Sequence, residues 1–403
     1  MTATSLLLVL LLFAAVSSKP LVRPNQLRNG SDRSFIVKFK DDSDVDLSCG
    51  AMTRHFRDFK MNTKVRHSFK RVFRGASLDN VSPSTMQWLM TQDYIESIEE
   101  VTYFRTALSV GPEPDPITMV DGNYLNWGLD RITEVTYTSG DYEYNPSGTG
   151  KNTNIFIVDT GVRLTHLEFS GRADFMNVNN DPMESNDCEG HGTQTSGVAV
   201  GTWRGTATQA YIVSVKVLGC DGVGTSDSVL SGLEAILTAQ PEGNAVVSMS
   251  ITSDSPSESV HEAIANLVDA GFVVVAAAGN LGDDACFYYP AAYPEVVVIT
   301  VGAINAKGKL ASFSNFGPCV DIYAPGANIY TATNEGDDQI KSLKGTSFAA
   351  PFVSGAAAIL LEQSVLPKDI KTTIIQTATT SVSIGNLPAG SHNRILHIDS
   401  KET

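Results

Sequence analysis

The chain has 403 residues, with 44 acidic and 29 basic side chains and a formal net charge of −15. Its 42% hydrophobic and 18% charged residues are typical of a globular protein, which excludes a wholly disordered or fibrous chain. The acidic balance argues against a surface for nucleic acid. The length is sufficient for one large domain or two modest ones.

The charge is distributed unevenly along the chain. Residues 19–108 hold 15 Lys and Arg against 11 Asp and Glu, a net charge of +4, whereas residues 109–403 hold 14 against 33, a net charge of −19. This asymmetry indicates two segments with different roles. They are either electrostatic partners or two unrelated solvated surfaces.

The N-terminus carries an apolar run from Leu6 to Val16, followed by Ser17 and Ser18. The run is too short to span a bilayer, which needs about 20 residues, so it predicts a secretory signal peptide over residues 1–18. The first five residues contain no Lys or Arg, and a cytosolic apolar N-terminus is the alternative. Because no later stretch is long and apolar enough to cross a membrane, we expect a secreted protein without membrane contact.

Residues 19–108 predict a small α/β domain. Period-2 runs and a Ser-Pro helix start define its elements, with strands over 34–40, 65–73 and 94–100 and a helix over 82–92. The following residues, 109–126, are rich in Pro, Gly and acidic side chains and have no periodicity. They predict a linker or processing region.

Residues 127–403 alternate apolar runs with helical patterns. Val- and Ile-rich runs predict strands over 154–160, 210–218, 245–251, 272–280 and 295–304. Helical patterns cover 227–239, 259–270, 347–362 and 368–377. Unbroken strands that alternate with helices predict an α/β fold, a mostly parallel sheet with helices on both faces. In such sheets, catalytic groups collect at the carboxyl ends of the strands.

Three polar residues lie at such positions. Asp159 ends the first strand in "IVDTGV", His191 lies between glycines in "DCEGHGTQTSG", and Ser347 begins an apolar helix in "KGTSFAAPF", with Pro351 expected in its first turn. Each alone is explained by a turn residue, a loop histidine or a helix N-cap. Together they supply an acid, a base and a nucleophile in one of the known chain orders of the catalytic triad.

The sequence resembles the subtilisin-like serine proteases, and among them the proteinase K branch, in "DTGV", "DCEGHGT", "AAAGN", "FSNFG", "APG" and "GTSFAAP". The resemblance implies a subtilisin-like peptidase domain over residues 127–403. It also implies that Ser347 is the nucleophile, His191 the general base and then acid, and Asp159 the group that orients the imidazole. Asn280 and the backbone N–H of Ser347 would bind the oxyanion.

The resemblance further implies that substrate binds as an extended strand. The implied substrate-binding residues form two walls and a floor, namely Gly222, Val223 and Gly224, then Ser248, Met249 and Ser250 up to Ile251, and finally Ala277, Ala278 and Gly279. Thr252 and Ser253 stand where relatives usually have two glycines. We therefore hypothesise a narrowed primary pocket or an altered subsite preference.

The five cysteines are at positions 49, 188, 220, 286 and 319. Spacing alone leaves three pairings of the last four open, and the absence of a CxxC pair argues against a structural zinc site. The resemblance implies the bridges Cys188–Cys220 and Cys286–Cys319. Free buried thiols are the alternative.

The resemblance also implies a structural calcium ion, bound by the carbonyls of Pro290 and Ala292 and by the carboxylate of Asp321. Asp321 as a turn cap is the alternative. No catalytic cofactor is implied.

Residues 19–108 resemble the inhibitory propeptides of these enzymes, which are small ferredoxin-like α/β domains. Such a domain acts as a folding template and then as a tethered inhibitor, and the resemblance places self-cleavage near Leu108. The expected protein is therefore a secreted, self-activating serine endopeptidase, a monomer that acts on proteins and peptides. The alternative is a catalytically silent relative that keeps its propeptide and works as a secreted binding protein.

Overall fold

The computed structural model describes residues 33–107, 119–120, 123–124, 126–134, 144–176, 178, 186–240, 245–293 and 298–401. The predicted signal peptide, Leu108 and most of the predicted linker lie outside the described residues. The chain divides into two compact units. Unit 1 extends to Ser68 and from Arg74 to Glu100, and unit 2 comprises Phe69–Phe73 and the chain from Val101 onward.

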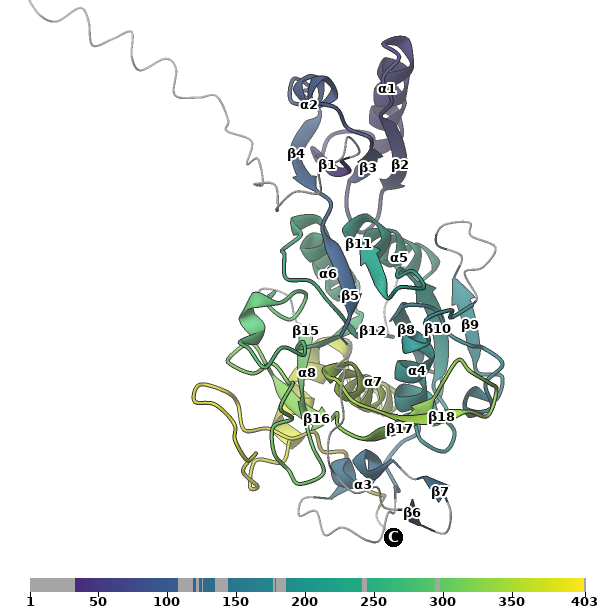
Figure 1. Cartoon of the computed structure of the whole chain (residues 1–403), viewed down its shortest axis with the longest axis vertical. Coiled ribbons are helices and arrows are strands. Elements are labelled where there is room, and N and C mark those ends of the chain that lie inside the picture. The colour runs from purple at the N-terminus through teal and green to yellow at the C-terminus, as the bar shows by residue number, and fades with distance from the viewer. Residues whose placement is uncertain are drawn as a thin grey trace, which may run out of the picture. The chain divides into compact units, whose positions relative to one another are not determined.

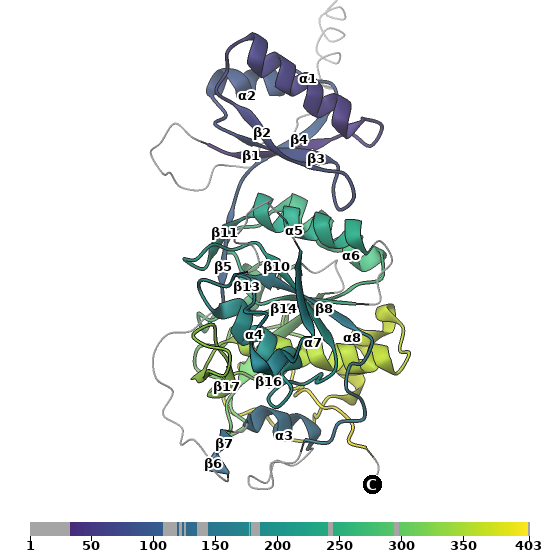
Figure 2. The same cartoon turned by 90° about the vertical axis from the view of Figure 1, so that its right-hand side faces the viewer.

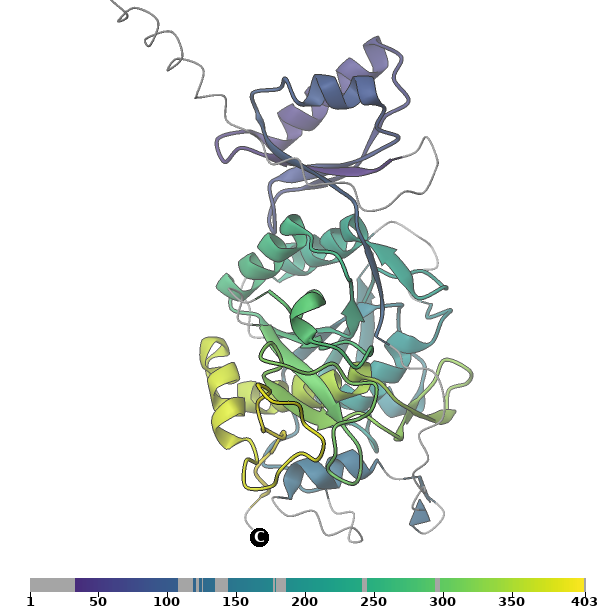
Figure 3. The same ribbon diagram turned by 60° about the vertical axis from the view of Figure 1, so that its left-hand side comes forward.

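Unit 1 is a four-stranded antiparallel sheet with helices on one of its faces, as Figures 2 and 3 show. Its strand order is β2-β3-β1-β4. The elements in chain order are β1 Phe35–Phe39, α1 Val45–Asp58, β2 Lys64–Phe69, β3 Gly75–Asp79, α2 Pro83–Leu89 and β4 Ile95–Glu100. The βαββαβ order and this sheet are those of a ferredoxin-like domain.

Two elements of unit 1 have weak sequence signals, and we did not expect them. Helix α1 begins after Asp44, whose carboxylate accepts the N–H of Leu47 at 2.9 Å, and it buries Met52 and Phe56. Strand β3 is a short "GASLD" segment that pairs with β1. Both form because a few apolar side chains pack into one small core, although neither has a strong pattern of its own.

The large sheet of unit 2 has seven strands in the order β16-β15-β14-β12-β8-β10-β9, and every neighbouring pair is parallel. The strands are β8 Asn154–Asp159, β9 Ala173–Met176, β10 Tyr211–Lys216, β12 Val246–Met249, β14 Val273–Ala277, β15 Val298–Ile304 and β16 Ile322–Pro325. The predicted parallel sheet is therefore confirmed. The central strands bury side chains on both faces, as their unbroken apolar sequences predict.

Helices cover both faces of this sheet, with α5 and α6 on one face and α4 and α7 on the other (Figure 2). The helices of unit 2 are α3 Trp127–Thr133, α4 His191–Val200, α5 Ser226–Ala239, α6 Glu258–Asp269, α7 Thr346–Glu362 and α8 Pro367–Thr377. In the described chain, no single helix is long and apolar enough to cross a bilayer; only α7 and α8 together pass such a test, and they are bent by 117°.

A second, antiparallel sheet of unit 2 contains a strand from the segment that precedes the predicted linker. Strand β5, Tyr103–Thr106, pairs on one side with β11, Val223–Thr225, and on the other with β13, Ile251–Thr252. Figure 1 labels β5 and β11, and Figure 2 also labels β13. The compact units therefore divide at Glu100, whereas the predicted propeptide extends to residue 108. The reason is that residues 101–107 make their backbone hydrogen bonds with unit 2.

The remaining short elements of unit 2 lie around these sheets. They are β6 Met119–Val120, β7 Asn123–Tyr124, β17 Ile329–Ala332, β18 Ile340–Leu343 and the 3-10 turns Leu167–Phe169 and Ala285–Phe287.

Candidate active site

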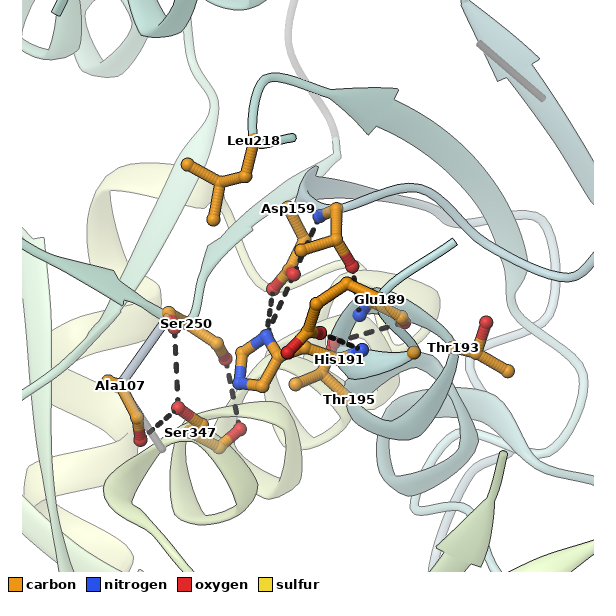
Figure 4. Close-up of polar contacts among 12 residues, drawn as sticks. Ala107, Asp159, Glu189, His191, Thr193, Thr195, Leu218, Ser250 and Ser347 are labelled. Atoms are coloured by element: carbon orange, nitrogen blue, oxygen red, sulfur yellow. Dashed lines mark hydrogen bonds and ion pairs between the residues drawn. The ribbon is translucent and has the colours of Figure 1, made fainter. Parts of the chain in front are cut away.

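Three elements bring the predicted triad together (Figure 4). Asp159 is the last residue of β8, His191 is the first residue of α4, and Ser347 is the second residue of α7. The strand ends at the carboxyl edge of the parallel sheet, and both helices begin there. This is the edge at which α/β proteins place their chemistry.

Asp159 and His191 form a buried hydrogen-bonded pair. The imidazole Nδ1 lies 2.8 and 2.9 Å from the two carboxylate oxygens, and the side chains are 1% and 0% exposed. The backbone N–H of Thr160 donates to the same carboxylate at 2.7 Å. This contact places the imidazole proton on Nδ1 and leaves the lone pair on Nε2.

Two more carboxylates lie close to His191. Glu189 accepts the backbone N–H of His191 at 2.7 Å, and Asp187 accepts the hydroxyl of Thr160 at 2.8 Å. Burial by itself lowers the pKa of His191, but the charge and hydrogen bond of Asp159, followed by the charges of Glu189 and Asp187, raise it. The net direction is upward from 6.5, so the site stabilises the imidazolium.

The hydroxyl of Ser347 contacts a peptide carbonyl and makes no hydrogen bond with the imidazole. Its Oγ donates to the carbonyl of Ala107 and lies 3.3 Å from the carbonyl of Ser250. Within the described residues, Nε2 of His191 is buried without a hydrogen-bond partner. His191 and Ser347 are therefore neighbours in Figure 4, but no hydrogen bond joins Nε2 to Oγ.

Asn280 holds the same carbonyl from another side. Its Nδ2 donates to the carbonyl of Ala107, while its Oδ1 accepts the backbone N–H and the hydroxyl of Thr346 at 2.8 and 2.9 Å. These two bonds determine which end of the amide points at Ala107. The carbonyl oxygen of Ala107 thus lies beside a hydroxyl and a fixed amide donor.

Gly345 leaves room for this carbonyl. A Cβ at this position would lie 2.8 Å from the oxygen of Ala107 and 3.2 Å from Nδ2 of Asn280. Any larger residue would displace the carbonyl or the amide that binds it. The glycine before the serine in "KGTS" is therefore needed for close approach.

Pro351 acts on the same helix start. It is the sixth residue of α7 and lies in the second turn, so the expectation of a first-turn proline is wrong. Because proline has no N–H, it cannot donate to the carbonyl of Ser347 four residues earlier. The hydroxyl of Ser250 donates to that carbonyl instead, at 3.0 Å.

Strand β5 lies along the expected walls. Thr106 donates its N–H to the carbonyl of Gly222 at 3.0 Å, and Ala107 donates to the carbonyl of Ser250 at 3.1 Å. Val223 and Gly224 pair with β5 through β11. These four wall residues therefore contact an extended segment, as the resemblance implies.

The other five expected residues lie deeper and do not pair with β5. Ser248 and Met249 belong to β12, where they pair within the parallel sheet, so the wall begins only at Ser250. Ala277 ends β14, while Ala278 and Gly279 accept hydrogen bonds from Asn315. Backbone groups of these five residues are used within the parallel sheet or by Asn315, and none of them pairs with β5.

Thr252 and Ser253, which the resemblance marks as departures, leave the path of β5 open. Thr252 pairs with Arg105 in regular antiparallel register. Ser253 is buried, exchanges backbone hydrogen bonds with Tyr289 at 2.8 and 2.9 Å, and donates its hydroxyl to the carbonyl of Ser255. Pairing at these positions uses the backbone, so side chains do not exclude an extended segment.

The four cysteines of unit 2 are paired as Cys188–Cys220 and Cys286–Cys319. This is the pairing that the resemblance implies. Cys49 of unit 1 is a free thiol.

The expected calcium ligands do not fit a calcium ion as they stand. The carboxylate of Asp321 lies 2.8 Å from the ammonium of Lys371 and accepts the N–H of Thr300 at 2.9 Å. Lys371 also donates to the carbonyl of Val298 at 2.7 Å. A positive charge from the protein thus faces the only carboxylate of the expected ligand set.

One of the two expected carbonyl ligands already accepts a hydrogen bond. The carbonyl of Pro290 accepts the N–H of Tyr293 at 3.1 Å, and that of Ala291, before the expected ligand Ala292, accepts the hydroxyl of Thr300. Calcium takes six to eight oxygen ligands. Among the described residues, no cluster of three or more His, Cys, Asp or Glu side chains is placed to hold a metal ion.

We therefore expect thermal stability to be insensitive to calcium and to depend on Lys371. In a Ser347→Ala background, which prevents self-digestion, the melting temperature should be the same in a chelator and in calcium chloride. Lys371→Met leaves a partly buried carboxylate without its cation and should cost about 1–2 kcal/mol, or a few degrees. Calorimetry measures both effects.

The control for this experiment is Lys368→Met, because Lys368 is an exposed lysine of the same helix. It removes the same charge without touching Asp321. A wild-type melting temperature that falls by several degrees in chelator would contradict the assignment.

Comparisons with known proteins agree with this geometry. A profile of the subtilase family matches residues 150–394. Alkaline serine exoprotease A of Vibrio alginolyticus is 35% identical over 327 residues, which cover 79% of this chain and 57% of that protein. An extracellular serine proteinase of a Thermus species is 37% identical over 278 residues, or 67% of this chain and 65% of that protein. The chain thus spans less than two thirds of these two relatives.

The fold comparison leads to the same family. The crystal structure of a cold adapted subtilisin-like serine proteinase aligns with a TM-score of 0.63 and 33% sequence identity. The alignment covers 68% of this chain and 98% of that one. The chain therefore belongs to the subtilase family of serine proteases.

Proposed function

We propose that the chain is a secreted endopeptidase that cleaves itself after Ala107. One observation carries the proposal: the carbonyl of Ala107 ends an antiparallel strand and lies against both the hydroxyl of Ser347 and the amide of Asn280. This is where the carbonyl of a peptide substrate must lie for attack by the serine. The proposed substrates are therefore polypeptides bound in an extended conformation, and the first of them is the chain itself.

The proposed reaction has two acyl-transfer steps. His191 takes the proton of Ser347 on Nε2 as the hydroxyl oxygen attacks the carbonyl carbon, and the oxyanion is bound by Asn280 and the N–H of Ser347. The tetrahedral intermediate collapses to an acyl-enzyme when the imidazolium gives that proton to the leaving amine. Water then repeats the sequence and releases the acid. Asp159 holds the imidazole and stabilises its charged form.

One rotation precedes these steps. In the described arrangement Ser347 donates to the carbonyl of Ala107, while Nε2 of His191 has no partner. On our proposal, the hydroxyl turns about its Cα–Cβ bond toward Nε2 before the proton moves. Hydrogen bonds between catalytic groups are often formed only in the reacting complex.

Residues that precede the cut also support an inhibitory role. Phe104 is fully buried in β5, so the strand contributes a side chain as well as backbone contacts. The segment Phe69–Phe73 is part of unit 2, where the carboxylate of Glu234 accepts the three backbone N–H groups of residues 70–72 at 3.0 Å. Asn266 donates to the carbonyl of Val72. After cleavage these contacts would keep the cut segment in the site.

Replacement of the nucleophile tests self-cleavage. Ser347→Ala should leave the secreted precursor uncut, whereas the wild-type product should begin at Leu108. N-terminal sequencing and the mass of the secreted protein measure both. Ser381→Ala, at an exposed serine far from the site in sequence, is the matched control and should be processed normally.

Two results would contradict the proposal. Processing of Ser347→Ala at the same junction would show that another enzyme makes the cut. A purified mature wild-type chain that neither hydrolyses casein nor reacts with a serine-directed fluorophosphonate would favour a secreted binding protein.

The pH dependence follows from His191. The imidazole must be neutral to act as a base, so kcat/KM should fall as the pH is lowered through its pKa. Although burial opposes it, Asp159, Glu189 and Asp187 hold this pKa above 6.5, and the acid limb should lie there. Glu189→Gln removes one negative charge, lowers the pKa and should move the limb to lower pH.

The control for the pH experiment is Glu258→Gln, which removes a carboxylate from the exposed side of α6. The acid limb of its kcat/KM profile should lie at the same pH as that of the wild type. Activity that stays constant down to pH 4 would contradict a histidine base.

Thr252 and Ser253 test the expected subsite change. Thr252→Gly with Ser253→Gly removes the side chain opposite Arg105, the third residue before the proposed cut, together with the buried hydroxyl that follows it, and should broaden the preference for that third residue in a peptide library. The single variants Thr252→Gly and Ser253→Gly separate the effect of the strand residue from that of the buried residue. An unchanged preference would show that these side chains do not select substrates.

A further inference from the structure

Thr106 is the second residue on the N-terminal side of the proposed cut, and its surroundings define what that position recognises. Its backbone pairs with Ile251, and its N–H donates to Gly222. A Cβ on Gly222 would lie 3.2 Å from Oγ1 of Thr106 and 3.6 Å from Oε1 of Glu189. Oγ1 of Thr106 and Oε1 of Glu189 therefore both border the space that a side chain at position 222 would fill.

The two carboxylate oxygens of Glu189 differ in their hydrogen bonding. Oε2 accepts the backbone N–H of His191 at 2.7 Å, which fixes the side chain beside the catalytic base (Figure 4). Within the described residues, Oε1 has no hydrogen bond, and Glu189 has no cationic side chain as its partner. One charged oxygen therefore remains free beside the position of the second substrate residue.

Neighbouring carboxylates do not offer such an oxygen. Asp187 accepts four hydrogen bonds, from Thr160, from the N–H of Gly190 and from the N–H and hydroxyl of Thr193. The carboxylate of Asp159 accepts hydrogen bonds from the N–H of Thr160 and from Nδ1 of His191, and its side chain is 1% exposed. Of the three carboxylates around His191, Glu189 is therefore the one with an oxygen left to meet a substrate side chain.

The local field also favours a cation at this place. Burial raises the pKa of Glu189, and the charges of Asp159 and Asp187 add to the increase, while His191 opposes it. A carboxylate crowded by other carboxylates gains from a positive partner. A lysine or arginine in place of Thr106 would bring one, since the lysine ammonium is carried on a flexible four-carbon stem, which is longer than the threonine side chain.

We propose that Glu189 selects substrates with lysine or arginine as the second residue before the scissile bond. The residue binds the substrate cation through Oε1 and is held in place by its bond to His191. This inference rests on the proposed function, because it takes Ala107 as the residue at the cut. The self-cleavage segment, with Thr106 at this position, is a neutral substrate and does not use the contact.

The test uses the self-processed wild-type enzyme and fluorogenic peptides that copy residues 103–107. The second residue before the cut is Thr, Lys, Met or Glu. Lysine and methionine have similar length and differ in charge, so the ratio of their kcat/KM values isolates the contact. We expect a ratio of about 5–20 in the wild type, falling to about 1 in Glu189→Gln.

Two further measurements test whether the preference comes from the charge of Glu189. Glu189→Lys should reverse the preference and favour the peptide with glutamate. The wild-type ratio should fall with ionic strength, because a half-exposed pair is screened by salt. Glu258→Gln, the surface control, should keep the wild-type ratio.

The outcomes separate this inference from the proposed function. Cleavage of the threonine peptide with a lysine-to-methionine ratio that Glu189→Gln leaves unchanged overturns the inference and keeps the endopeptidase. If the wild-type enzyme cleaves none of the peptides, the proposed function is overturned, and the inference with it.

Discussion

The pairing of strand β5 with β11 on one side and β13 on the other is the constraint on which the rest of the site depends. Two backbone hydrogen bonds, from Thr106 to Gly222 and from Ala107 to Ser250, determine the register of the strand. A shift by one residue would exchange the faces to which its side chains point. With this register, the carbonyl of Ala107 meets Ser347 and Asn280, and Thr106 lies beside Glu189.

The catalytic groups occupy positions that ordinary secondary structure produces at one edge of the sheet. Strand β8 ends in a carboxylate, α4 starts with an imidazole, and the second residue of α7 carries a hydroxyl. The N–H groups in the first turn of a helix have no partner within the helix and can bind an anion. Small adjustments complete the arrangement. Gly345 makes room for the substrate carbonyl, and Pro351 releases a carbonyl that Ser250 then binds.

Two charged residues give this chain features that do not follow from the triad. Lys371 places an ammonium against Asp321, where the resemblance implied a calcium ion. Glu189 places a carboxylate oxygen beside the second substrate position. In each case we expect a single charge to decide what the site binds, because its partner is at least partly shielded from water.

The sequence by itself determined the class of fold and pointed to Asp159, His191 and Ser347 as the reacting groups that we propose. Unbroken apolar runs specify buried parallel strands, and Asp159, His191 and Ser347 stand in short motifs that do not depend on distant residues. Helix α1, the contact of Thr346 with Asn280, the strand pairing of β5 and the pairing of Lys371 with Asp321 were decided only by tertiary structure. Each of these joins residues far apart in the chain or rests on packing against them, and local propensity carries no information about such contacts.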